Sequence, residues 1–238
     1  MLKAVILDDE LRGSTLLNRK LDFFKGDLEV VAVFNDPYKA LSKIADLQPD
    51  VLFLDVEMPG LNGFEFLEKL GSFAFQVIFT TAYDTYTLEA LRLSAVDYLL
   101  KPIDEDELHT AIFRLKKRMA EYPRSHTAET PGRLALSTAE GVYLIDSSSI
   151  IRVEAMSNYS TFYLRDQKKI MVSKTLKEYE NTLQGNSFLR ISRSAIVNLD
   201  YVVKYRKGDG GTLEMTDGTE VEVSASRKEA LMEKLSIH

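Results

Sequence analysis

The first 120 residues of the chain alternate between short apolar runs and longer stretches with apolar residues at helical spacing. The apolar runs predict buried strands at residues 3–7, 29–34, 51–54, 76–80 and 96–100. The amphipathic stretches predict helices at residues 10–24, 37–47, 63–70, 84–93 and 104–119. Five strands that alternate with five helices indicate an α/β fold, a doubly wound parallel sheet with helices on both faces. Strands without polar alternation fit a sheet that is covered on both sides.

Individual residues support the predicted helices. In residues 10–24 the apolar positions at helical spacing are Leu11, Leu16, Leu17, Leu21 and Phe24. Asp36 stands before Pro37 and is expected to cap the helix at 37–47. Asp104 is followed three residues later by Glu107, which predicts a capping box at the start of the helix at 104–119.

The pattern changes after residue 121. Residues 122–132 are polar, contain two prolines and show no periodicity, so we expect a linker between a first domain at 1–121 and a second at 133–238. The second domain is predicted to be mainly β. Its expected strands are 133–137, 141–146, 149–155, 160–165, 168–173, 188–192, 200–206, 212–216 and 219–224, and its expected helices are 175–183 and 226–235. Asp217 and Gly218 are expected to form a hairpin turn.

The charge of the chain is unevenly distributed. Its 238 residues carry a net charge of −6. Residues 1–122 hold 14 Lys and Arg against 21 Asp and Glu, whereas residues 123–238 hold 16 against 15. An acidic first half does not bind nucleic acid through bulk charge, so such binding requires a local basic face in the second half.

Several classes of protein are excluded by composition. The chain has no cysteine, so disulfides, thiolate metal sites and a cysteine nucleophile are impossible. No apolar run approaches the roughly 18 residues that span a bilayer, and the N-terminus lacks the pattern of a signal peptide. A cytoplasmic protein without membrane insertion is therefore expected.

Polar and charged residues follow four of the five predicted strands. The first strand is followed by Asp8, Asp9 and Glu10, the third by Asp55, the fourth by Thr81 and the fifth by Lys101 and Pro102. The carboxyl ends of parallel strands share one edge of the sheet, where ligands bind in doubly wound folds. The fold is thus expected to bring these residues, distant in sequence, into one pocket.

The residue types in this pocket indicate phosphoryl chemistry. Three carboxylates repel one another unless a cation is present, and Mg²⁺ with oxygen ligands meets that need. The ion would also neutralise phosphoryl oxygens, with Lys101 as a second positive charge and the Thr81 hydroxyl as a donor. No cysteine or histidine stands at these strand ends, so a carboxylate is the expected nucleophile. Asp55, alone at the end of a central strand, is the best candidate.

The first half contains four segments in order: LDDE at 7–10, LDVEMPGLNG at 54–63, TTAY at 80–83 and DYLLKP at 97–102. In these segments it resembles the flavodoxin-like receiver domain of bacterial response regulators. The resemblance covers residues 1–120 and implies that Asp55 is the phosphoacceptor. It also implies that Asp8, Asp9, Asp55 and the backbone carbonyl of Glu57 hold Mg²⁺, that Thr81 and Lys101 contact the phosphoryl group, and that Tyr98 is an aromatic switch.

The second half contains an ordered set of segments: IRVEA at 151–155 and on to Asn158 and Tyr159, KTLKEYE at 174–180, FLRISRS at 188–194 and on to Val197 and Asn198, and residues 217–224. In these segments it resembles the LytTR-type DNA-binding domain over residues 133–235. A common form of the family has His where Ser192 stands, and a basic residue where this chain has Ala225. The resemblance implies that loops enter successive major grooves. The implied DNA contacts are Asn158, Arg193 and either Ser226 or Arg227, with Lys174, Arg190, Lys204, Arg206 and Lys228 as phosphate contacts.

The leading hypothesis is a phosphorylation-dependent transcriptional regulator of a two-component phosphorelay system, not an enzyme. A sensor histidine kinase would phosphorylate Asp55. A homodimer would form through the face built by residues 84–93, 96–100 and 104–119, and two second domains would bind spaced promoter repeats in double-stranded DNA. Two alternatives stay open: a receiver whose output domain binds protein, and a Mg²⁺-dependent phosphohydrolase with an Asp nucleophile.

Overall fold

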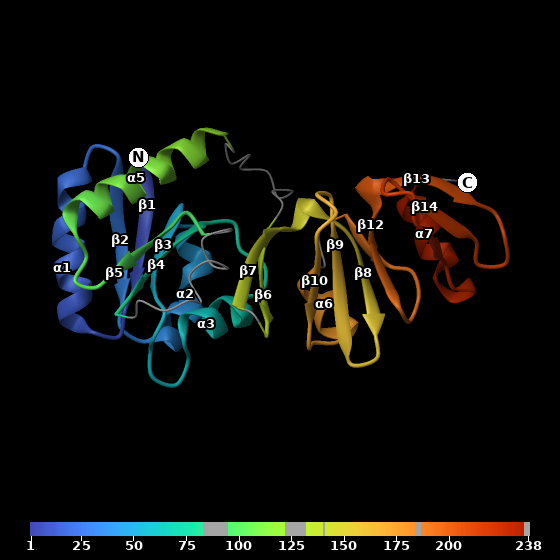
Figure 1. Cartoon of the computed structure of the whole chain (residues 1–238), viewed down its shortest axis with the longest axis horizontal. Helices are drawn as coiled ribbons and strands as arrows, with labels where there is room; N and C mark the ends of the chain where they lie inside the picture. The colour runs from blue at the N-terminus through green and yellow to red at the C-terminus, as the bar shows by residue number, and fades with distance from the viewer. Residues whose placement is uncertain (83–94, 122–131, 140, 184–186, 236–238) are drawn as a thin grey trace. The chain divides into compact units, whose positions relative to one another are not determined.

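The computed structural model describes residues 1–82, 95–121, 132–139, 141–183 and 187–235. The chain divides into two compact units, Met1–Leu144 and Ile145–His238. Each unit has its own sheets and helices, which can be followed in Figure 1. Among the described residues, no helix is both long enough and apolar enough to cross a membrane.

The first unit is built on a five-stranded parallel sheet with the order β2-β1-β3-β4-β5. Its strands are β1 (Leu2–Leu7), β2 (Leu28–Phe34), β3 (Val51–Asp55), β4 (Gln76–Thr81) and β5 (Asp97–Leu100). The order reverses beside β1, which places β1 and β3 at the centre of the sheet. The predicted parallel sheet is confirmed.

Helices cover both faces of this sheet. One face packs against α1 (Leu11–Leu21) and α5 (Glu105–Glu121), with η1 (Asp22–Phe24) continuing from α1. The opposite face packs against α2 (Pro37–Leu47) and α3 (Gly63–Leu70). Successive residues of a strand point to opposite faces of the sheet. Ile6 packs in the apolar cluster with α1 and α5, and Leu7 packs in the cluster with α2 and α3. The helix expected at 84–93 lies outside the described residues.

The first helix buries less of its apolar stripe than its spacing predicts. Leu17 and Leu21 pack against the sheet, but Leu11 is 70% exposed and Leu16 is 50% exposed. The helix start at 37–47 is as expected, because the Asp36 carboxylate accepts bonds from the Tyr38 and Lys39 amides. The Asp104 carboxylate likewise accepts from the amides of Asp106 and Glu107.

A β-hairpin formed by β6 (Arg133–Thr138) and β7 (Gly141–Asp146) packs on α3. Arg133 and Phe73 exchange both backbone hydrogen bonds, at 2.6 and 3.0 Å. Ala135, Val142 and Leu144 are buried in the same apolar cluster as Phe73 and the α3 side chains. Most of the hairpin therefore groups with the first unit, while the expected domain boundary at residue 133 stays a prediction.

The second unit is mainly β, as predicted (Figure 1). Its larger sheet is antiparallel, with the order β10-β9-β8-β12-β11, and its smaller sheet has the order β13-β14-β15. The strands are β8 (Ile150–Met156), β9 (Tyr159–Leu164), β10 (Lys169–Val172), β11 (Phe188–Arg190), β12 (Ala195–Asn198), β13 (Val202–Arg206), β14 (Thr212–Met215) and β15 (Glu220–Glu222). The helices are α6 (Leu176–Thr182) and α7 (Lys228–Lys234), with short turns η2 (Ser147–Ser149), η3 (Leu199–Tyr201) and η4 (Ala225–Arg227).

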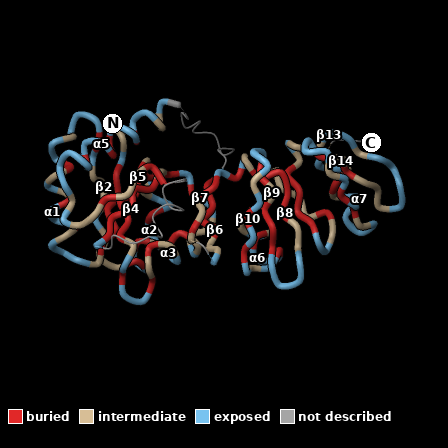
Figure 2. Tube along the Cα trace, viewed as in Figure 1, coloured by how far each residue is buried: buried red, intermediate tan, exposed pale blue. Residues whose placement is uncertain are grey.

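One strand of the second unit differs from the expectations, and one expected turn is present. Strand β12 was not among the predicted strands, yet it lies between β8 and β11 and all four of its residues are buried. Figure 2 shows most of β4 in the first unit and of β8 in the second as buried stretches. The expected hairpin turn is confirmed, since Gly218 has a φ of 79° and its amide donates to the Met215 carbonyl between β14 and β15.

We predict that Leu144→Ala destabilises the first unit, because Leu144 is only 3% exposed and belongs to the cluster around α3. The expected loss is about 2–5 kcal/mol of the free energy of unfolding. Hydrogen exchange of the β4 backbone amides measures it. Met171→Ala is the control, because Met171 is 50% exposed. This substitution should change the free energy of unfolding obtained from exchange by less than about 0.5 kcal/mol. Unchanged β4 exchange in Leu144→Ala would show that the hairpin does not stabilise this unit.

Candidate functional site

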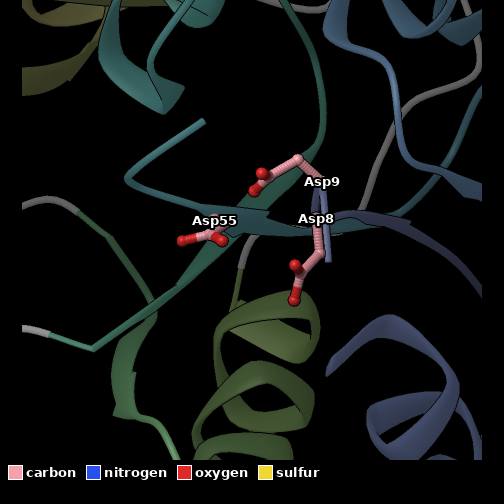
Figure 3. Close-up of side chains that lie close together, drawn as sticks. All are labelled: Asp8, Asp9 and Asp55. Atoms are coloured by element: carbon pink, nitrogen blue, oxygen red, sulfur yellow. The ribbon is translucent and has the colours of Figure 1, made fainter. Parts of the chain in front are cut away.

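Three carboxylates meet at the carboxyl ends of the two central strands. Asp8 and Asp9 directly follow β1, and Asp55 is the last residue of β3 (Figure 3). Each residue offers an oxygen within 4.8 Å of the others. Asp8 is 1% exposed and Asp55 is 4% exposed. The predicted convergence of these acids is confirmed.

Lys101 supplies the positive charge of this cluster. Its Nζ lies 2.6 Å from Oδ2 of Asp55 and 3.0 Å from Oδ2 of Asp8. The Lys101 amide donates to the Thr81 carbonyl over 2.7 Å, which ties the ends of β4 and β5 together. The Lys101–Pro102 peptide bond is cis. One lysine thus bridges two of the three acids.

The electrostatics of the cluster favour a further cation. Burial raises the pKa of Asp55, and this effect outweighs the hydrogen bond from Lys101. The pKa of Asp9 is also raised, first by burial and then by the charge of Asp8. Burial opposes the charged form of Lys101, but its bonds to Asp55 and Asp8 prevail and raise its pKa. The ammonium therefore stays charged while two carboxylates are held in an unfavourable environment.

Backbone bonds fix the loops on either side of the acids. Oδ1 of Asp8 accepts from the Glu10 amide over 2.9 Å, and Oδ1 of Asp55 accepts from the Glu57 amide over 3.2 Å. The Asn35 side-chain amide donates to the Asp8 carbonyl over 2.5 Å. Each aspartate thus has a second role, in the turn that follows its strand. Asn35 was not among the predicted site residues.

Two glycines make room for the acids, and sequence reasoning missed both. A Cβ at Gly63 would lie 2.4 Å from the Asp55 carbonyl oxygen, which is backbone and cannot give way. A Cβ at Gly13 would lie 2.9 Å from Oδ2 of Asp8. Gly63 stands at the start of α3, so this helix approaches the end of β3 more closely than a residue with a Cβ would allow. Gly13 stands in α1, where a Cβ would require the Asp8 carboxylate to shift.

The remaining receiver residues lie close by in the fold. Thr81 ends β4 and is 1% exposed. Tyr98 is half-buried on β5, and its ring centroid is 6.4 Å from that of Phe79. Their expected contact and switch roles stay predictions, as does that of the Glu57 carbonyl.

In the second unit, hydrogen bonds join three loops that carry expected DNA contacts. The Ala155 amide, beside the β8–β9 turn that holds Asn158, donates to the Ser194 carbonyl over 2.8 Å. The Ser224 amide donates to the Ile191 carbonyl over 2.9 Å. Loops around residues 158, 193 and 226 therefore lie together at one end of the larger sheet. The side chains of Asn158, Arg193, Ser226 and Arg227 are exposed there.

Several expected phosphate contacts already have partners within the chain. Arg206 bonds to Glu214 and Glu220. Nζ of Lys228 donates to the carbonyls of Gly208 and Asp209. The remaining expected contacts are placed as follows: the Lys174 carbonyl accepts from Ser160 beside the β8–β9 turn, Lys204 is exposed on β13, and Arg190 bonds to Glu180. These assignments stay predictions.

Known proteins match both units. Residues 4–113 match the response regulator receiver domain, and residues 140–236 match the LytTr DNA-binding domain. The "Sensory transduction protein LytT" of Bacillus subtilis (strain 168) is 31% identical over 246 residues and covers 100% of both chains. The "Transcriptional regulatory protein BtsR" of Escherichia coli (strain K12) is 29% identical over 246 residues, also with 100% of both chains covered. Among solved structures, the receiver domain of AraT, a response regulator from Geobacillus stearothermophilus, is 32% identical with a TM-score of 0.45, over 52% of this chain and 98% of that one.

The fold and these matches define a response regulator with a receiver and a DNA-binding output domain. The chain belongs to the family of LytT-type response regulators. The predicted fold class and the predicted class of function, a DNA-binding response regulator, are thereby confirmed. The match to a DNA-binding domain favours DNA over protein as the target of the output domain.

We predict that Asp9→Asn stabilises the protein in metal-free buffer at about pH 7.5. Because the pKa of Asp9 is raised above its ordinary value of 3.8, ionised Asp9 opposes folding. That opposition is absent below the ordinary value, grows as the pH rises towards the folded-state pKa, and is complete above it. Thermal denaturation at about pH 7.5 and about pH 4.5 should show a higher melting temperature for the variant, with the larger difference at the higher pH. A lower melting temperature for the variant at both pH values would contradict burial and repulsion as the dominant forces on Asp9.

Proposed function

We propose that Asp55 is the phosphoacceptor of this response regulator and that its phosphorylation by a sensor histidine kinase controls DNA binding. The observation that carries the proposal is the bridge from Lys101 to Asp55 and Asp8 at the ends of the central strands. A carboxylate oxygen of Asp55 attacks phosphorus, an oxygen–phosphorus bond forms, and the bond from phosphorus to the leaving group of the donor breaks. The product is an acyl phosphate.

The acidic cluster also fits a divalent cation. Three carboxylate oxygens within 4.8 Å of one another are the hard ligands that Mg²⁺ prefers. Asp8, Asp9, Asp55 and the Glu57 carbonyl would hold the ion, which when bound neutralises charge on the transferring group. Lys101 supplies a second positive charge, and Thr81 provides a hydroxyl donor at the neighbouring strand end.

Phosphorylation is proposed to act through the β4 and β5 side of the first unit. The phosphoryl group adds about −1.5 to −2 charge beside Lys101 and Thr81. Tyr98, half-buried next to Phe79, then changes position and alters the surface of β5 and α5. That surface carries charges of both signs, such as Asp97 and Arg114, whose side chains lie 2.7 Å apart in one chain. Such a surface suits a self-complementary homodimer.

The end of the larger sheet in the second unit is proposed to contact promoter repeats in DNA, in the cytoplasm. Asn158, Arg193 and Ser226 or Arg227 are exposed on three loops that hydrogen bonds hold together. Side chains of these types serve base edges as well as phosphates. A dimer would present two such sets of loops to two half-sites.

Asp55→Asn tests the phosphoacceptor. Asn keeps the shape of the side chain but cannot form an acyl phosphate. With a small-molecule phosphodonor and Mg²⁺, the wild-type chain should gain one phosphoryl group by intact mass and bind DNA more tightly. The variant should do neither. Asp46→Asn on the exposed face of α2 is the matched control and should respond as the wild type does. A phosphodonor response that persists in Asp55→Asn would sink the assignment.

Arg193→Ala tests the DNA contacts. Loss of a base contact should weaken binding to a site selected from a random DNA pool by about 1–3 kcal/mol and relax the preference at one position. Arg165→Ala is the control, because Arg165 is exposed in the β9–β10 turn, away from the three loops. Equal losses on selected and scrambled DNA would identify Arg193 as a phosphate contact instead.

A further inference from the structure

Helix α6 places one carboxylate between two of the loops proposed to contact DNA. Oε2 of Glu180 lies 2.7 Å from a guanidinium nitrogen of Arg190, at the end of β11. Oε1 of Glu180 lies 3.9 Å from a guanidinium nitrogen of Arg227, in η4. The two oxygens of one side chain thus face arginines from two segments that are more than thirty residues apart in the sequence.

Arg190 continues this connection into the loop that carries Arg193. Its Nε donates to the Ser192 carbonyl over 3.2 Å, and its second terminal nitrogen donates to the Arg193 carbonyl over 3.1 Å. With the bond to Glu180, all three nitrogens of the guanidinium have partners within the chain. Only 18% of the Arg190 side chain is exposed.

The backbone carbonyls of residues 191–194 all accept hydrogen bonds from other parts of the domain. The Ile191 carbonyl accepts from the amide and the hydroxyl of Ser224, at 2.9 and 3.1 Å. Arg190 holds the next two carbonyls, and the Ala155 amide holds that of Ser194. Four successive carbonyls therefore have fixed donors, two of them from one guanidinium. The backbone at Arg193 is therefore fixed by hydrogen bonds, while the side chain of Arg193 is exposed.

We infer that Glu180 and Arg190 are positioning residues for DNA recognition: Glu180 orients Arg190, and Arg190 sets the shape of the loop that presents Arg193. The inference rests on the proposed DNA contacts of that loop. It replaces the expectation that Arg190 contacts phosphate. A bidentate or base-edge contact needs its arginine held in one geometry, and order established before binding lowers the entropy that binding must remove.

The charge of Glu180 makes the inference sharply testable. A carboxylate beside bound DNA repels phosphates, so electrostatics alone predicts that Glu180→Gln tightens binding to any sequence. A positioning role predicts the opposite for the selected site, because neutral Gln holds Arg190 less firmly. Likewise, Lys can replace Arg at a phosphate contact as a point charge, but it cannot hold three partners in a plane.

The experiment measures binding of the full chain, with phosphodonor, to a selected duplex and a scrambled duplex over a series of salt concentrations. Arg190→Lys should lose roughly 5- to 100-fold in affinity for the selected site, the range expected when one base contact fails. Its affinity for scrambled DNA and its salt slope should match the wild type, because no phosphate contact is lost. Glu180→Gln should also lose affinity for the selected site.

Matched controls carry the same chemical changes elsewhere. Arg165→Lys repeats the arginine change in the β9–β10 turn, and Glu222→Gln removes an exposed carboxylate on β15 close to Ser224. Neither should weaken binding to the selected site. If Arg190→Lys binds as the wild type does, or if Glu180→Gln binds the selected site more tightly, the inference is overturned.

Hydrogen exchange of the free protein separates this inference from the proposed function. Amides at 191–195 should exchange faster in Glu180→Gln and Arg190→Lys, whereas amides of β8 and β9 should not, which also shows that the domain stays folded. Unchanged exchange at 191–195 overturns the positioning role. A wild-type chain that binds selected and scrambled DNA equally would instead overturn the proposed contacts, and the exchange result would still decide whether the two residues order the loop.

Discussion

The first unit is organised around the burial of acids at the end of an apolar sheet. Asp8 directly follows β1 and Asp55 is the last residue of β3, and both side chains are buried, so water solvates their charges poorly. Lys101 offsets part of the repulsion through direct contacts with both. Because this compensation is incomplete, the pKa values of Asp55 and Asp9 stay raised, and an additional cation at the site would be favourable. If side chains of the protein compensated these charges fully, binding of a cation would stabilise the site less.

The strand ends of the first unit could be predicted because the spacing of apolar residues, and the polar residues that follow them, can be read from a short stretch of sequence. An apolar run followed by Asp or Lys marks both a strand and its end, and parallel pairing then brings the ends together. Gly13 and Gly63 could not be found in this way, since their necessity comes from backbone and side chains that approach only in the folded chain. Leu11 and Leu16 show the converse, because helical spacing alone does not say how wide a stripe the sheet can cover.

The second unit was harder to predict for a physical reason. Its strands are short, and β12 is a run of only four residues directly after the loop at 191–194, so periodicity has little length in which to show. Its organisation depends on contacts between distant segments, namely an apolar cluster that spans both sheets and side-chain bonds between them. Arg152 on β8 pairs with Glu154 and with Asp217 in the β14–β15 turn, and its guanidinium lies 3.8 Å from the Tyr163 ring centroid. One buried arginine thereby joins the two sheets.

The two functional regions use ion pairs in opposite ways. At the strand ends of the first unit, one lysine serves two acids, so a phosphoryl group on Asp55 would compete for the same ammonium and loosen its hold on Asp8. The Lys101 amide also bonds to the Thr81 carbonyl, so the residue that carries this ammonium is joined to the end of β4. In the second unit, one acid serves two arginines, and the result is a loop fixed in advance. Under the proposed function, a lysine shared between acids that it neutralises only in part suits a site that switches. An acid shared between two arginines, one of which also bonds to two backbone carbonyls, suits a loop that presents one conformation to DNA.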